Sequence, residues 1–158
     1  MIFSFGLLIT LITYIYPHEG FIIFGILHCI GLSIMLSYPF LRRNTYNLEI
    51  GVILIIVGLL LQYILVDFPW LLWVGIRPTP FYTLDYFPLL PWFGVVLLGT
   101  VLGQKLYQKN KRRFDLVAKA PNTIARFLCL LGRHSLFIYL VHQPILIGII
   151  LLLTQASL

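Results

Sequence analysis

The feature that most constrains this chain is a series of apolar runs long enough to cross a lipid bilayer. A transmembrane helix needs about 20 mostly apolar residues, with a range of roughly 17–25. Runs of this kind cover residues 20–41, 48–66, 91–107 and 135–154, and a shorter run covers residues 2–16. We therefore predict an all-α protein, a polytopic membrane bundle of about five transmembrane helices.

The composition agrees with a membrane environment. The 158 residues are 60% hydrophobic and only 10% charged, whereas an ordinary soluble domain has about 25% charged residues. So few polar groups do not cover a water-facing surface. The length suits one domain, so we expect residues 1–158 to form a single transmembrane domain.

The basic residues lie in short segments between the apolar runs and set the expected orientation. Arg42 and Arg43 lie in one such segment, and a second basic stretch extends from Lys105 to Arg133, while Arg77 lies on the opposite side. Cytoplasmic loops carry the excess of Lys and Arg. We therefore expect a multi-pass protein of the plasma membrane with a cytoplasmic N-terminus and an outer C-terminus. The net charge of +6 then needs no nucleic-acid partner.

The segments between the runs carry further structural signals. Residues 122–132 are apolar but short, which predicts an interfacial helix leading into the last span. Asn47 stands where it would cap the third helix. Residues 67–90 form a long aromatic segment on the outer side, and aromatic side chains prefer the interface. The plainest interpretation of this segment is a lid on the membrane surface.

Short motifs indicate no metal site. Cys29 and Cys129 do not form a spaced pair typical of metal or redox sites. Each lies in an apolar stretch, so we expect both to be small buried hydrophobic residues. Walker, Rossmann, serine-elbow and zinc signatures are absent from the sequence.

Two histidines lie within apolar runs, where an ionisable group indicates function. His28 follows the start of the second run by eight residues, and His142 follows Ser135 by seven. At 1.5 Å per residue both are expected roughly 10–12 Å below their helix starts, at similar depth. They are candidates for a general base or for orienting a substrate. The alternative is that they only make hydrogen bonds between helices.

Asp85 is the sharpest feature of the aromatic segment. It stands among Tyr86, Phe87 and Trp92. Partial desolvation by such neighbours raises the pKa of a carboxyl group, which suits proton transfer or contact with a substrate amine. The alternative is a solvated residue of the surface lid.

Four residues on the expected cytoplasmic side are candidates for binding an anionic donor: Arg42, Arg43, Arg133 and His134. Lys and Arg side chains bind phosphate groups well. The alternative is that these residues only anchor the topology.

Three stretches together carry a family resemblance. They are FGILHCIGL at residues 24–32, LDYFPLLPWFG at residues 84–94 with Leu98-Gly99 and Leu102-Gly103 beyond, and LGRHSLFIYLVHQP at residues 131–144. The chain resembles the prokaryotic branch of the heparan-alpha-glucosaminide N-acetyltransferase catalytic domain family. That family is related to a wider group of transmembrane acyltransferases.

The resemblance implies transfer of an acyl group across the membrane. The donor would be acetyl-CoA on the cytoplasmic side, and the acceptor would face outward and is often a sugar. We expect the catalytic groups to be His142, Asp85 and His28. Family members begin with further helices that hold a histidine thought to be essential. We therefore expect these 158 residues to be the C-terminal portion of a larger bundle, completed by upstream helices or by another chain, including a second copy.

Two other interpretations stay open at this point. Histidines in the middle of the membrane and a helix broken by Pro144 also suit a carrier or lipid-handling protein. A catalytically incomplete membrane fragment would use its histidines only for packing. Passage of a substrate without covalent change would favour the carrier.

Overall fold

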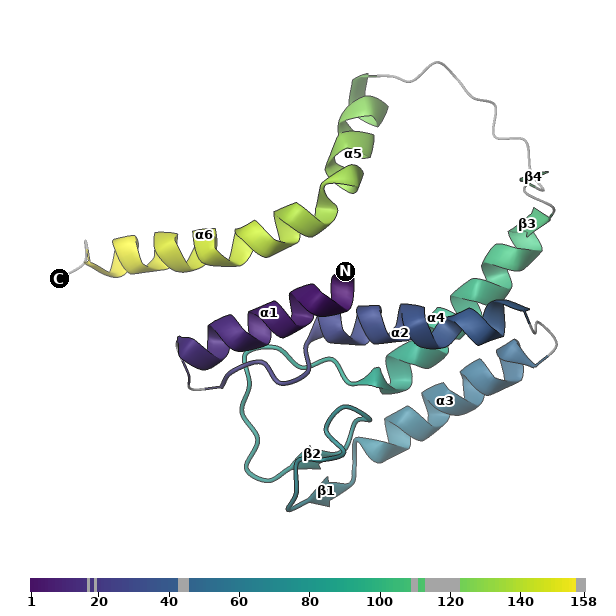
Figure 1. Ribbon diagram of the computed structural model, residues 1–158, viewed down its shortest axis with the longest axis horizontal. Coiled ribbons are helices and arrows are strands. Elements are labelled where there is room, and N and C mark those ends of the chain that lie inside the picture. Colours follow the sequence, from purple (N-terminus) through teal and green to yellow (C-terminus); the bar gives the residue numbers. More distant parts are fainter. Residues whose placement is uncertain (17, 19, 43–45, 109–110, 113–122, 156–158) are drawn as a thin grey trace. The chain divides into compact units, whose positions relative to one another are not determined.

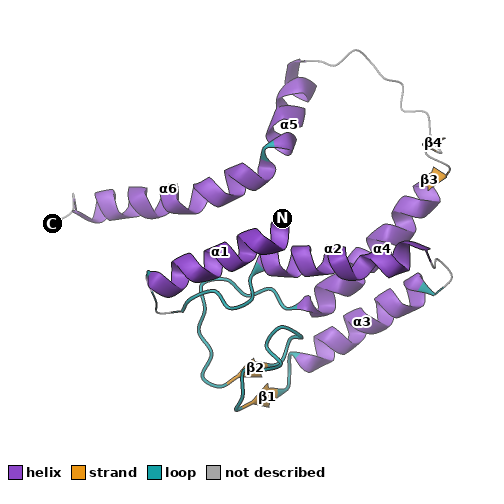
Figure 2. Ribbon diagram, viewed as in Figure 1, coloured by secondary structure: helices purple, strands orange, loops and turns teal. Residues whose placement is uncertain are grey.

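The computed structural model describes residues 1–16, 18, 20–42, 46–108, 111–112 and 123–155. The chain divides into two compact units, Met1–Arg113 and Phe114–Leu158. Figure 2 shows that helices dominate the described part of both units, which confirms the all-α prediction.

The first unit holds four helices and two very short strand pairs (Figure 1). The helices are α1 (Ile2–Ile15), α2 (Ile26–Arg42), α3 (Asn47–Leu61) and α4 (Leu89–Leu106). Strand β1 (Leu65–Val66) pairs in parallel with β2 (Arg77–Pro78), and β3 (Tyr107–Gln108) pairs antiparallel with β4 (Lys111–Arg112). Helix α3 packs most extensively on α4, while α2 contacts both α1 and α4.

The second unit holds α5 (Thr123–Arg133) and α6 (Ser135–Gln155). The predicted short helix at 122–132 and the predicted helix at 135–154 are therefore both present. The axis of α5 is bent by 65° from the first part of α6, residues 135–142.

The prediction of a helix from residue 20 is wrong at its start, because α2 begins only at Ile26. Gly20 has a positive φ of 71°. The segment that follows pairs with the aromatic loop instead. The Leu84 amide donates to the Gly20 carbonyl at 2.8 Å, and the Phe87 amide donates to the Phe24 carbonyl at 3.1 Å. His28 therefore lies in the first turn of α2 and not 10–12 Å along a helix.

The expected cap of α3 is also wrong. Tyr46 occupies the N-cap position, and Asn47 is the first helical residue. The Asn47 side chain is 1% exposed, and its Nδ2 donates to the Phe40 carbonyl at 2.6 Å. Gln104 Nε2 donates to the neighbouring Leu41 carbonyl at 3.0 Å. The last carbonyls of a helix have no partner inside it, so these two amides satisfy the end of α2.

The helix lengths leave the prediction of five spans unconfirmed. Among the described residues, α4 alone is long and apolar enough to cross a membrane by itself, and α5 with the start of α6 qualifies only as a bent pair. Helices α1, α2 and α3 have 14, 17 and 15 residues. They are roughly 21–26 Å long at 1.5 Å per residue, against a hydrocarbon core of about 30 Å.

The first unit buries several polar residues beside its apolar core and exposes many large apolar side chains. His28, Ser33, Ser37 and Asn47 are buried. Large apolar side chains are exposed along α1 and α3, among them Leu8, Leu11, Ile53, Ile56 and Leu60. Soluble proteins seldom expose continuous apolar surface of this extent. The pattern is typical of helices that face lipid.

Glycines bring the helices of the first unit close together. A Cβ on Gly94 of α4 would lie 2.5 Å from the Gly51 carbonyl oxygen of α3, and a Cβ on Gly58 would lie 2.7 Å from Pro91. On α2, a Cβ on Gly31 would lie 2.6 Å from the Phe3 nitrogen of α1. Small residues at helix crossings are characteristic of membrane bundles, where close van der Waals packing drives association.

Candidate functional site

The candidate site of the first unit lies where the aromatic loop meets the start of α2. Asp85 Oδ2 accepts a hydrogen bond from the Ile26 amide, the first amide of the helix, at 3.0 Å. The carboxylate lies against Gly25, where any Cβ would collide with it. A helix N-terminus carries partial positive charge and unpaired N–H groups, so it stabilises an ionised carboxylate.

His28 is held at the adjacent amide. The Gly25 N–H donates to His28 Nδ1 at 3.3 Å, and His28 Nε2 lies 3.3 Å from Thr10 Oγ1. The Thr10 hydroxyl donates to the Ile22 carbonyl at 2.7 Å. Because the Thr10 hydroxyl hydrogen is used in the bond to Ile22, Thr10 Oγ1 must accept the N–H of His28 Nε2. His28 Nδ1 is then the acceptor for the Gly25 amide. This assignment corresponds to a neutral imidazole.

Aromatic rings and a glycine enclose His28, which is 3% exposed. The Phe24 ring stacks on it and the Phe3 ring meets it edge-on, both with centroids 5.5 Å away. A Cβ on Gly6 would lie 3.0 Å from the imidazole. Both ring nitrogens have partners, so in this conformation His28 joins α1 to α2. Its catalytic role stays a prediction.

The loop that carries Asp85 is fixed by its own contacts. The Thr83 hydroxyl donates to the Phe21 carbonyl at 2.9 Å, and the Tyr86 hydroxyl donates to the Leu72 carbonyl at 2.7 Å. Burial raises the pKa of Tyr86 to about 12, so its hydroxyl stays a neutral donor near neutral pH. Tyr86 and Phe87 also pack on a buried cluster formed by Phe24, Cys29 and Leu72. This part of the aromatic segment is therefore packed on α2. Its location at the membrane surface stays a prediction.

The structure brings together two of the three expected catalytic residues. Asp85 and His28 bond to consecutive amides, those of Ile26 and Gly25. His142 lies on α6 in the second unit, where it is exposed. Its Nδ1 bonds to the Tyr139 carbonyl, and the two rings lie 5.4 Å apart.

The four expected donor-binding residues are described to different extents. Arg42 ends α2, and Arg43 lies outside the described residues. His134 is exposed between α5 and α6, and its amide donates to the Leu130 carbonyl at 3.2 Å. Arg133 is the last residue of α5.

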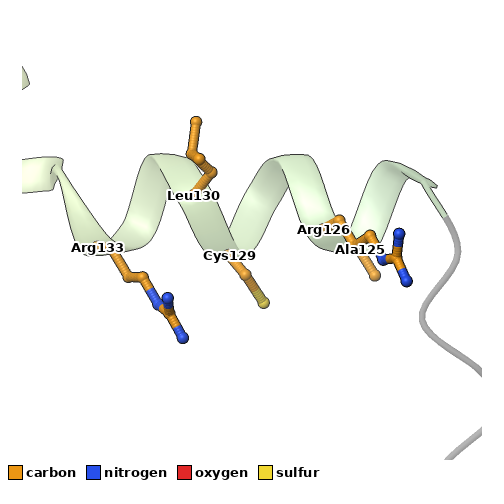
Figure 3. A pocket seen from close by; sticks show the side chains of 5 residues that line it. All are labelled: Ala125, Arg126, Cys129, Leu130 and Arg133. Atoms are coloured by element: carbon orange, nitrogen blue, oxygen red, sulfur yellow. The ribbon is translucent and has the colours of Figure 1, made fainter.

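Arg133 shares one side of α5 with a second arginine and a cysteine. A hollow of about 270 Å³ is lined by Ala125, Arg126, Cys129, Leu130 and Arg133. Figure 3 shows Cys129 and Arg133 projecting from one side of α5. Cys129 is exposed, contrary to the prediction that both cysteines are buried, whereas Cys29 is buried and its thiol donates to the Pro88 carbonyl at 3.5 Å.

Thr10 is the site residue that sequence reasoning missed. A hydroxyl residue within an apolar run was the available signal, but Thr10 and Thr13 look alike in the sequence. Only the fold shows that Thr10 reaches both His28 and the Ile22 carbonyl.

We expect Thr10→Val to lower the free energy of unfolding by about 1–3 kcal/mol, because it leaves a buried imidazole N–H and a carbonyl without partners. Unfolding of the purified chain in mixed detergent micelles measures this loss. Thr100→Val is the matched control, since the Thr100 hydroxyl only bonds back to the Leu97 carbonyl of its own helix. Equal losses in the two variants would contradict the role given to Thr10.

Comparison with known proteins identifies the family. The family model described as "Heparan-alpha-glucosaminide N-acetyltransferase, catalytic" matches residues 1–144. The chain belongs to this family. The match includes His28, Asp85 and His142 and confirms the resemblance seen in the sequence. Family members are membrane-associated and use acetyl-CoA as donor. No curated protein and no solved structure matches the chain.

Proposed function

We propose that the chain takes part in acetyl transfer across the plasma membrane, from cytoplasmic acetyl-CoA to an outward-facing acceptor, a sugar. The observation that carries this proposal is the family match over residues 1–144. It is supported by the burial of polar groups inside the first unit and the exposure of apolar ones.

The chemistry requires a proton acceptor near the acceptor nucleophile. A bond forms between the acceptor nitrogen or oxygen and the acetyl carbon, the carbon–sulfur bond breaks, and coenzyme A leaves as the thiol after taking up a proton. A positioned base removes the proton from the acceptor. Holding the thioester beside the acceptor removes much of the entropic barrier.

Asp85 is the first-unit candidate for this base. Its side chain is partly exposed. Oδ2 is bonded to the Ile26 amide, and within the described residues Oδ1 has no hydrogen-bond partner. A carboxylate held by one oxygen at a helix N-terminus is oriented while its second oxygen remains available. Both nitrogens of His28 already have hydrogen-bond partners, so we assign it a positioning role. Through its bond to the Gly25 amide it holds the start of α2 beside Asp85.

His142 is the second-unit candidate. Its Nδ1 is bonded to a carbonyl of its own helix, which leaves Nε2 available on an exposed side chain. We propose that Nε2 contacts the acetyl donor or the acceptor. For the donor phosphates we propose Arg42, Arg43, Arg133 and His134 on the cytoplasmic side, since cationic side chains bind phosphate.

Transfer across a sealed membrane tests the proposal. Right-side-out vesicles from cells that express the chain are loaded with acetyl-CoA labelled in the acetyl group and given a glucosamine-terminated oligosaccharide outside. We expect labelled N-acetylated oligosaccharide in the external medium, in excess of vesicles lacking the chain. An unlabelled oligosaccharide that enters the vesicles unchanged would instead favour a carrier.

A further inference from the structure

Helix α5 has two contrasting sides. With 3.6 residues per turn, one side carries the apolar residues Ile124, Phe127, Leu128 and Leu131. The other side carries Arg126, Cys129 and Arg133. Within the second unit, every residue of α5 is exposed. A strongly amphipathic helix with arginines on its polar side is suited to the boundary between membrane and water.

The bend between α5 and α6 gives this helix a direction. Helix α6 has 21 residues with no Asp, Glu, Lys or Arg, so it is roughly 31 Å long, close to the hydrocarbon thickness of about 30 Å. If α6 crosses the bilayer, as the proposed function requires, the 65° bend inclines α5 toward the membrane plane. This step rests on the membrane-spanning part of the proposed function.

The polar side of α5 carries concentrated positive charge. Arg126 and Arg133 are seven residues apart, about two helical turns or roughly 10.5 Å along the axis. Together with Cys129 they line the hollow of about 270 Å³, and α5 has no Asp or Glu to neutralise them. Guanidinium groups bind phosphate oxygens through paired hydrogen bonds.

We propose that α5 lies in the cytoplasmic membrane–water interface and that Arg126 and Arg133 bind the phosphates of anionic phospholipid headgroups. Coenzyme A offers the same phosphate chemistry. A ligand dissolved in water would contact only the polar side of α5, whereas one lipid leaflet meets the arginines with headgroups and the apolar side with acyl chains.

Depth measurements on the full chain test the orientation of α5. The chain has two cysteines, so Cys29→Ser leaves Cys129 as the only attachment point for a nitroxide label. The variant Cys29→Ser/Cys129→Ser/Leu128→Cys places the label on the opposite side. In nanodiscs we expect oxygen to relax the label at position 128 and a water-soluble nickel chelate to relax the label at 129. If the chelate relaxes the labels at positions 128 and 129 equally, or if protein shields both labels from oxygen and chelate, the proposed orientation is wrong.

Binding measurements test the headgroup. The purified full chain in neutral detergent is titrated with phosphatidylglycerol, phosphatidylcholine and coenzyme A, separately. Each arginine near an anionic surface strengthens binding by about fivefold. We therefore expect Arg126→Gln/Arg133→Gln to weaken phosphatidylglycerol binding roughly 25-fold. The single variant Arg126→Gln, at a residue outside the expected donor-binding set, should weaken it about fivefold and leave coenzyme A binding unchanged. The control is Arg77→Gln, because Arg77 is an exposed arginine of the first unit.

The outcomes separate this inference from the proposed function. Weaker coenzyme A binding with unchanged phosphatidylglycerol binding in the double variant would overturn the inference and make the arginines part of the donor site. Equal binding of both lipids by the unaltered chain would also overturn it. If the labels and the lipid preference behave as expected while vesicles show no acetyl transfer, the inference stands and the acetyltransferase function fails.

Discussion

Asp85→Asn is expected to lower the rate of acetyl transfer by about 10²–10⁴-fold, the range by which a positioned proton acceptor contributes to catalysis. Asparagine keeps an oxygen that accepts the Ile26 amide, and it is as good a helix cap as aspartate. The variant therefore removes the carboxylate charge and basicity at position 85 while keeping the hydrogen bond that holds the aromatic loop to α2. Labelled acetyl transfer in sealed vesicles, at matched protein levels, measures the effect.

Two further variants make this result specific. Asp67→Asn changes an exposed carboxylate elsewhere in the aromatic segment, and this variant should transfer acetyl groups at the unaltered rate. Asp85→Ala removes the cap as well, so it should also unfold more easily. If Asp85→Asn retains full activity, Asp85 is a helix cap and the base must be sought elsewhere.

Gly94→Ala should give the largest loss of stability among single methyl additions in α4. The new Cβ would lie 2.5 Å from the Gly51 carbonyl oxygen and 2.7 Å from Ile55 Cγ1. Backbone atoms do not yield as a flexible side chain does, so α3 and α4 must separate. Overpacking of this kind costs about 1–3 kcal/mol, which exceeds the gain of up to about 1 kcal/mol from replacing glycine by alanine in a helix.

Gly99→Ala is the matched control in the same helix, since a Cβ there meets nothing within 4 Å. We expect this variant to unfold at the same or a slightly higher denaturant concentration than the unaltered chain, while Gly94→Ala unfolds earlier. The reverse order would show that α3 and α4 do not cross at Gly51 and Gly94.

Hydropathy predicts the first and last helices well and the start of α2 poorly. The runs at 2–16 and 135–154 correspond closely to α1 and α6. The run at 20–41 includes six residues before α2, residues 20–25. The carbonyls of Gly20, Phe21 and Phe24 accept hydrogen bonds from the aromatic loop instead. Hydropathy does not distinguish a helical amide from one that pairs with a distant loop, so Ile26 could not be predicted as the helix start.

For the candidate site, the sequence predicts which residues matter but not how they lie relative to one another. Asp85 and His28 were each chosen because polar groups among apolar neighbours are costly, but their placement on consecutive amides could not be predicted. Residues 26 and 85 are separated by 59 positions, and no periodic pattern links them. Thr10 could not be identified either, since its importance depends on the close contact of Gly6 with the His28 ring.

Both ends of α2 are tied to other elements by polar side chains. At its start, Asp85 and His28 hold the amides of Ile26 and Gly25, and at its end Asn47 and Gln104 hold the last carbonyls. Sliding or rotating this helix would break hydrogen bonds at opposite ends simultaneously. We therefore expect helix α2 to keep its position, and any conformational change in the first unit to involve the other segments.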